Sequence, residues 1–108
     1  MIGEFEYLIL TSAARLAADA YGASIRKEIE RVTARRCSIG ALYTTLDRLE
    51  TKGFVKTRMG EPTPERGGRS KRLVQVTATG VKEAGEFFRT IARISKGASW
   101  TTNRPTTR

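Results

Sequence analysis

A stretch near the middle of the chain, residues 38–55, carries side chains that suit the reading of DNA bases. Its polar residues recur at helical spacing and comprise Tyr43, Thr44, Thr45, Asp47, Arg48 and Thr51. Short hydrogen-bonding side chains and an arginine are the groups that meet base edges in a major groove. An ordinary amphipathic surface helix has a similar composition, so this stretch alone leaves both interpretations open.

The residues around this polar face predict a helix from Ser38 to Lys52. Ser38 can cap its start, and Gly53 suits the left-handed position that follows its end. An apolar stripe at helical spacing predicts the buried face; it consists of Ile39, Leu42, Leu46 and Leu49. The residues expected nearest the DNA are Ser38, Gly40, Ala41, Tyr43, Thr44 and Arg48.

Positive charge is concentrated around the predicted helix Ser38–Lys52, which we call the groove helix because it is expected to enter a major groove. The net charge of the chain is +9, and residues 26–72 hold thirteen Lys and Arg against six Asp and Glu. A local excess of this size is the electrostatic footprint of a surface that binds a polyanion. We expect phosphate contacts from six cations: Arg35, Arg36, Lys56, Arg69, Lys71 and Arg72.

The sequence argues against catalysis and metal binding. It contains no histidine and one cysteine, which excludes histidine-based acid–base chemistry and the usual zinc clusters. The candidate carboxylate pairs are Glu4/Glu6, Glu28/Glu30 and Glu83/Glu86. Each pair is expected on a solvated helix face beside Lys or Arg. We therefore predict no enzyme activity, no metal site and no cofactor.

Cys37 is the one group whose chemistry is ambiguous. It follows Arg35 and Arg36 and precedes a helix N-terminus, a setting that lowers a thiol pKa and favours oxidation. A redox switch at the start of the groove helix is one interpretation. The alternative is a small, semi-buried packing residue.

The flanking segments predict a winged helix-turn-helix domain over residues 1–77. Helices are expected over Glu4–Ala18 and about Ala23–Val32, and strands over Phe54–Met59 and Ser70–Thr77. Gly22, in the turn between the first two helices, is free to take an unusual backbone conformation. The two strands and the Gly/Pro-rich loop between them form a basic wing that can reach phosphates or a minor groove. The predicted fold class is mainly α with a two-stranded β-wing.

Two helices carry more apolar surface than one small core needs. Glu4–Ala18 is apolar over much of its circumference, and a helix over residues 78–96 places Phe87 and Phe88 on different sides. These second faces predict a C-terminal dimerisation helix and an interface formed by Phe5, Leu8, Phe87, Phe88 and Ile91. A flat ligand could lodge between the two helices and stack on Phe5, Phe87 or Trp100. Residues 97–108 are expected to be a disordered tail.

The remaining composition favours a soluble, cytoplasmic protein. No apolar run approaches the roughly 20 residues that span a membrane. The first ten residues are acidic, whereas a secretory signal begins with basic residues. A single cysteine cannot form an internal disulfide, which fits a reducing compartment.

Four short motifs extend over about residues 5–90. They are Tyr21-Gly22 with Ile25; Leu42-Tyr43 with Leu46, Leu49 and Gly53-Phe54-Val55; Gly67-Gly68-Arg69; and Thr77 with Gly80. In order and spacing they resemble the PadR family of bacterial transcriptional regulators. The resemblance implies a dimer that binds an operator and is released by a small molecule or another signal. The chain departs from the family pattern at Thr44, where proline is common, at Leu73 and Val74, where tyrosines are usual, and in its short C-terminal helix.

Together these features predict a homodimeric, sequence-specific DNA-binding regulator, acting as a repressor on a palindromic operator. The alternative is a winged-helix module that binds another protein, because fold does not determine function. The cations of the wing beside Arg35 and Arg36 favour DNA, since a protein-binding module has no need of them. RNA binding is disfavoured, because only Tyr43 is a candidate for base stacking.

Overall fold

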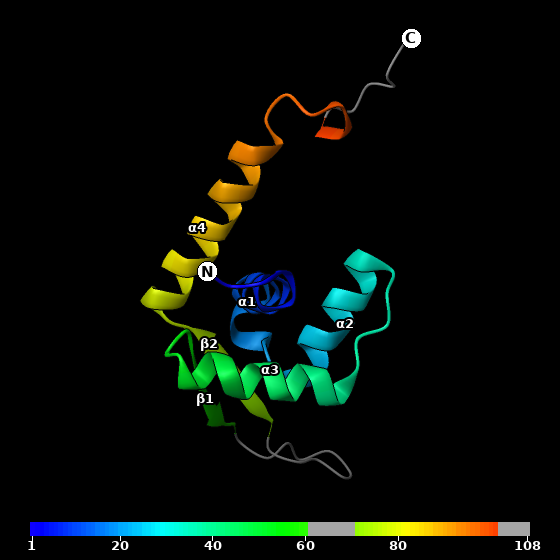
Figure 1. Cartoon of the computed structure of the whole chain (residues 1–108). Coiled ribbons are helices and arrows are strands. Elements are labelled where there is room, and N and C mark those ends of the chain that lie inside the picture. Colours follow the sequence, from blue (N-terminus) through cyan, green and yellow to red (C-terminus); the bar gives the residue numbers. More distant parts are fainter. Residues whose placement is uncertain (61–70, 102–108) are drawn as a thin grey trace.

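The computed structural model describes residues 1–60 and 71–101. Its elements in chain order are α1 (Glu4–Leu16), a 3-10 turn η1 (Ala17–Asp19), α2 (Gly22–Thr33), α3 (Ile39–Thr51), β1 (Val55–Met59), β2 (Arg72–Val76), α4 (Ala78–Ser95) and a second 3-10 turn η2 (Ser99–Thr101). Helices α1 to α3 and the sheet form the body, and α4 extends away from it (Figure 1). Within the described ranges, none of the helices is long and apolar enough to cross a membrane.

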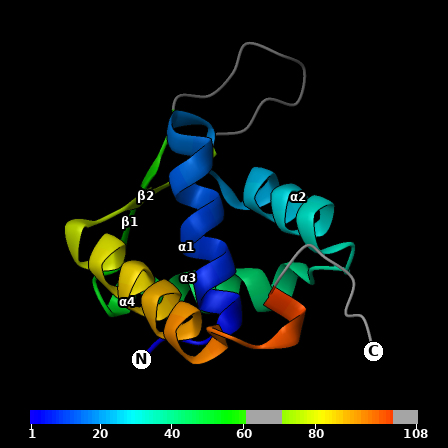
Figure 2. The same ribbon diagram turned by 90° about the horizontal axis from the view of Figure 1, so that it is seen from above.

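Helices α1, α2 and α3 pack together because each buries an apolar stripe. α1 lies centrally and contacts α2, α3, α4 and β2 (Figure 2). The largest fully buried side chains are Ile9, Leu10, Ile25, Leu42, Leu46, Leu49 and Val55. Three of them come from α3, which confirms most of its predicted apolar stripe.

The strands β1 and β2 form the antiparallel hairpin of the wing. Their register runs from Val55 opposite Val76 to Met59 opposite Arg72. β1 begins one residue later than predicted, and Lys71 and Thr77, predicted in the second strand, lie outside β2, while Ser70 is not among the described residues. The predicted hairpin is nevertheless confirmed, while the segment 61–70 that joins the strands lies outside the described residues.

Thr77 and Gly80 attach α4 to the sheet. The Thr77 hydroxyl donates to the Gly53 carbonyl at 2.6 Å and accepts from the Gly80 N–H at 3.0 Å. A Cβ atom at Gly80 would overlap the carbonyl oxygen of Phe54, so only glycine allows this close approach. Gly53 has a φ of +80°, which confirms the left-handed conformation predicted after α3.

Three details of the helices differ from the sequence-based expectations. α1 ends at Leu16 and gives way to the 3-10 turn, where the predicted helix continued to Ala18. Ile39, predicted in the buried stripe, is 55% exposed because it opens α3 at the margin of the core. Thr45, predicted on the polar face, is buried. Its position three residues after Leu42 and four before Leu49 places it on the apolar side of the helix.

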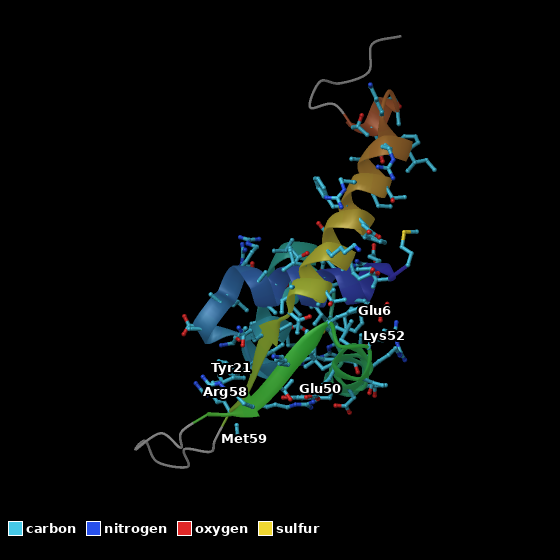
Figure 3. All side chains as sticks on the ribbon, turned by 90° about the vertical axis from the view of Figure 1, so that its left-hand side faces the viewer. Glu6, Tyr21, Glu50, Lys52, Arg58 and Met59 are labelled. Atoms are coloured by element: carbon cyan, nitrogen blue, oxygen red, sulfur yellow. The ribbon has the colours of Figure 1, made fainter. Side chains whose placement is uncertain are left out.

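Glu6 is buried, although the sequence predicted a solvated carboxylate. The carboxylate accepts hydrogen bonds from the Gly3 N–H and from the Lys52 ammonium, both at 3.0 Å (Figure 3). Burial alone raises a carboxyl pKa, but these contacts outweigh it, so the pKa of Glu6 lies below its ordinary value. Glu6 therefore ties the first turn of α1 to the end of α3.

Candidate nucleic-acid interface

The start of α3 presents its backbone and small side chains to solvent. Ser38 Oγ accepts a hydrogen bond from the Ala41 N–H at 3.1 Å, which confirms the predicted helix cap. Gly40 and Ala41 are exposed, and Thr44 and Arg48 follow on the exposed side. This end of the helix combines an accessible backbone with the positive pole of the helix dipole, a combination that favours phosphate and other anions.

Tyr43 has a different environment from the other predicted base-contacting residues. It is 38% exposed, because its ring packs across Gly22 at the start of α2. A Cβ atom at Gly22 would overlap the phenolic oxygen of Tyr43. Gly22 does not have a positive φ, so it does not use the conformational freedom that the sequence allowed it, and glycine serves here to make room. The contact sets how closely α3 approaches α2.

The segment that leads into α3 is held by two side chains of α2. Arg26 Nε donates to the Cys37 carbonyl at 2.7 Å, and Glu30 Oε2 accepts from the Cys37 N–H at 2.8 Å. The sequence did not predict this role for Arg26 or for Glu30, which was considered only as a solvated carboxylate, because their positions match no capping or pairing pattern with residue 37. They fix the path of the chain immediately before the groove helix.

Burial and the neighbouring charges of Glu30 and Arg26 set the pKa of the Cys37 thiol. The thiol is buried, and burial raises its pKa; the Glu30 carboxylate raises it further, against the opposing effect of Arg26. The predicted lowering of this pKa is therefore wrong. A buried thiol with a raised pKa fits the packing interpretation, since the thiolate is the reactive form.

Arg35 and Arg36 are exposed in the turn before α3, where phosphate contacts were predicted. Arg35 Nη2 lies 3.5 Å from Glu4 Oε1, and both side chains are largely exposed, so this ion pair is weak. Over the described ranges, Arg36 forms no ion pair. Both guanidinium groups can therefore turn toward an external anion.

The described part of the wing adds further exposed cations. Lys56 is exposed on β1, and Lys71 is exposed just before β2. The Lys71 ammonium lies 4.3 Å from the centre of the Tyr21 ring, an attractive cation–π contact that orients this side chain. Arg58, which the sequence analysis did not single out, is also exposed on β1. Arg69 lies outside the described residues.

Arg72 differs from the other predicted phosphate-binding residues. Its Nη2 atom lies 3.0 Å from Asp47 Oδ1 and 2.8 Å from Glu50 Oε1, and its side chain is 28% exposed. A phosphate contact by Arg72 would compete with both ion pairs to α3. Arg72 thus lies within the wing–helix contact rather than on the outer surface of the wing.

Helix α4 has two apolar sides, as predicted, and they have different environments. Phe87 packs on Tyr7, with ring centroids 4.9 Å apart. On the other side, Phe88 is 59% and Ile91 46% exposed. Phe88 and Ile91 are therefore accessible, as an interface requires. The other predicted interface residues, Phe5, Leu8 and Phe87, are partly buried against the chain's own core.

A hollow of about 720 Å³ lies between α1, the sheet and the start of α4. Its lining includes Ala13, Ala14, Ala17, Ala18, Val76, Val81 and Lys56. None of the aromatic residues predicted to stack on a flat ligand lines it. Trp100 is 82% exposed on η2. Residues 99–101, which were predicted to belong to a disordered tail, form that turn, and residues 102–108 lie outside the described ranges.

Comparison with known proteins gives a consistent family assignment. The model of the family described as "Transcriptional regulator PadR-like family" matches residues 9–86. A PadR family transcription regulator from Clostridium difficile R20291 is 26% identical, with a TM-score of 0.72 over 87% of this chain and 93% of that chain. A PadR-like regulator from Bacillus cereus is 16% identical, with a TM-score of 0.69 over 94% of this chain and 93% of that chain.

Another similar structure is that of F93 from STIV, a winged-helix DNA-binding protein. It is 23% identical, with a TM-score of 0.66 over 84% of this chain and 90% of that chain. At this identity the likeness shows the winged-helix fold alone. No curated protein sequence matches the chain significantly.

Proposed function

Because the chain belongs to the PadR-like family of transcriptional regulators, we propose that it is a homodimeric repressor that binds a palindromic operator in the cytoplasm. Each subunit inserts the exposed face of α3 into a major groove. The residues nearest the bases are Ser38, Gly40, Ala41, Thr44 and Arg48, with the exposed edge of Tyr43 beside them. A small-molecule or other signal releases the dimer from its operator.

One observation carries this proposal: cations flank the polar, weakly charged face of α3 at both of its ends. Arg35 and Arg36 precede the helix, and Lys56 and Lys71 lie on the wing. α3 and the wing occupy one side of the molecule, away from the free end of α4 (Figure 1). Phosphate contacts from the flanks would hold the helix in the groove, while its central residues meet the bases.

The apolar face of α4 supports the dimer. Val81, Phe88, Ile91 and Ile94 are 46–79% exposed on one helix. Such an apolar face is costly in water and favours association with a second copy. A two-fold dimer predicts an inverted repeat with half-sites about 34 Å, one turn of DNA, apart.

Four phosphate-binding cations per subunit predict a steep salt dependence. With about eight phosphate contacts per dimer, log K should fall against log salt with a slope near −7. A slope near zero would remove the electrostatic part of the proposal.

Selection from a pool of random DNA duplexes tests the function directly. We expect enrichment of an inverted repeat whose two halves are one turn apart. If no sequence is enriched over the starting pool, the protein is not a sequence-specific regulator, and a winged-helix module that binds another protein becomes the better hypothesis.

A further inference from the structure

A cluster of polar side chains joins β1 and β2 of the wing to α3. Arg72 of β2 binds Asp47 and Glu50 of α3 through Nη2, at 3.0 Å and 2.8 Å. Glu50 also accepts a hydrogen bond from the Thr57 hydroxyl of β1 at 2.7 Å. Figure 3 shows Glu50 on the side of α3 that meets β1. Glu50 is thus bound by both strands, and Asp47 by β2 alone.

The geometry directs Arg72 toward α3 and away from the wing surface. In the register of the hairpin, Arg72 pairs with Met59 and Thr57 pairs with Val74. Alternate residues of a strand share a face, so Arg72, Val74 and Thr57 lie on one face of the sheet. Val74 is buried, which identifies this face as the one packed on the body of the domain.

The electrostatics agree with this geometry. The hydrogen bond from Thr57 and then the Arg72 guanidinium lower the pKa of Glu50. Partial burial works against the charged form of Arg72, but the two carboxylates more than offset it and raise its pKa. Both carboxylates accept from the same nitrogen, Nη2, so a single planar NH₂ group of the guanidinium joins Asp47 to Glu50.

We propose that Arg72 is a positioning residue for DNA binding, which clamps the wing to α3 through Asp47 and Glu50 and does not bind phosphate. This proposal rests on the DNA-binding function proposed above. The clamp sets the distance between the bases read by α3 and the phosphates met by Lys56 and Lys71. It accounts for two acidic residues on a helix whose surroundings are otherwise strongly basic.

The proposal makes a prediction opposite in sign to that of simple electrostatics. The double variant Asp47→Asn/Glu50→Gln removes two negative charges beside the DNA. If Arg72 were a phosphate ligand, this change would release it and tighten binding. If the clamp positions the wing, the same change weakens operator binding, by about tenfold.

The experiment compares four proteins on the operator duplex enriched from the random pool: the wild type, Arg72→Met, Asp47→Asn/Glu50→Gln, and the triple variant. We expect each of the first two variants to lose about tenfold in affinity and the triple variant to lose no more, because all three break the same link. Arg72→Lys should retain part of the affinity, since it keeps the charge but replaces the planar NH₂ group that joins the two carboxylates with an ammonium on a differently shaped side chain.

Salt dependence distinguishes positioning from phosphate binding. Arg72→Met should keep the wild-type slope of log K against log salt. Lys56→Met is the matched control from the neighbouring strand, and its slope should be shallower by about 2 per dimer. Thermal unfolding of every variant checks the fold. If Arg72→Met does not fold, the sign of the change in Asp47→Asn/Glu50→Gln still decides.

Three outcomes would overturn the clamp. They are tighter binding by Asp47→Asn/Glu50→Gln, losses that multiply in the triple variant, and wild-type affinity in both Arg72→Met and the double variant. Failure of the wild-type protein to enrich or bind any duplex would instead refute the proposed DNA-binding function, so the two failures are distinguishable.

Discussion

Helices α3 and α4 are both amphipathic, but they expose opposite sides. α3 buries Leu42, Leu46 and Leu49 to 1% or less and turns its polar face outward. α4 buries only Gly80 and leaves Phe88 and Ile94 more than half exposed. A polar face flanked by cations is well hydrated and can bind a polyanion. An exposed apolar face is costly in water and favours contact with another protein. The contrast supports the proposal that α3 binds DNA and that α4 binds a second subunit.

Charging the outer face of α4 should have the largest effect. Phe88→Arg places a cation in the proposed dimer interface and should give a monomer by sedimentation equilibrium. Operator affinity should fall by about 100-fold or more, because two linked half-sites bind far more tightly than one. Glu86→Arg, an arginine at an exposed polar position of the same helix, is the control and should remain dimeric. A dimeric Phe88→Arg protein would assign α4 another role.

Filling the space between α2 and α3 should have the next largest effect. Gly22→Ala forces the Tyr43 ring away from α2 and should destabilise the fold by about 1–3 kcal/mol in urea unfolding. Gly40→Ala is the control, since its Cβ would approach only Ser38 Oγ, at 3.8 Å. Equal stability of the two variants would show that the contact between Tyr43 and Gly22 does not hold α3 in place.

Removing one exposed cation next to α3 should weaken DNA binding without changing the fold. Arg36→Gln should lower operator affinity about tenfold and make the salt slope shallower by about 2 per dimer. Its unfolding midpoint should match the wild type, because Arg36 makes no ion pair within residues 1–60 and 71–101. An unchanged slope would place Arg36 outside the DNA interface.

The ion pair that anchors the end of α3 should have the smallest effect, and it should depend on pH. The pKa of Glu6 is lowered in the folded state, so its stabilisation is present above the unfolded-state pKa, about 4.3, and is lost as the pH falls through the folded-state value. Glu6→Gln should cost about 1 kcal/mol at pH 7 and much less at pH 3. Urea unfolding at the two pH values measures this difference. A cost that does not change with pH would show that the charge of Glu6 is unimportant.

The fold was largely predictable because its information is local. Helical periodicity, a serine cap and a glycine stop define α3 within eighteen residues of sequence. Spacing also showed that α4 has two apolar sides. These signals depend on neighbours within one or two turns of a helix, so they can be read without knowing the tertiary structure.

The contacts that position the candidate site were not predictable, because they join residues far apart in the chain. Arg72 meets Asp47 across 25 residues, and Lys52 meets Glu6 across 46. Periodicity gives the direction of a side chain around its own helix, but not the partner that tertiary packing brings to it. For this reason the sequence predicts a phosphate contact for Arg72 and a solvated carboxylate for Glu6, whereas the structure pairs Arg72 with Asp47 and Glu50 and buries Glu6.

Hydroxyl-radical footprinting of the protein, with and without the selected operator, tests the contrast between α3 and α4 most directly. Phe88 should be protected in the free protein at concentrations where it is dimeric. Tyr43 of α3 and Met59 of the wing, which are 38% and 61% exposed, should be labelled in the free protein and protected only when DNA is added. Full labelling of Phe88 in the free protein, with no protection of Tyr43 or Met59 by the operator, would contradict the assignment of separate partners to the two helices.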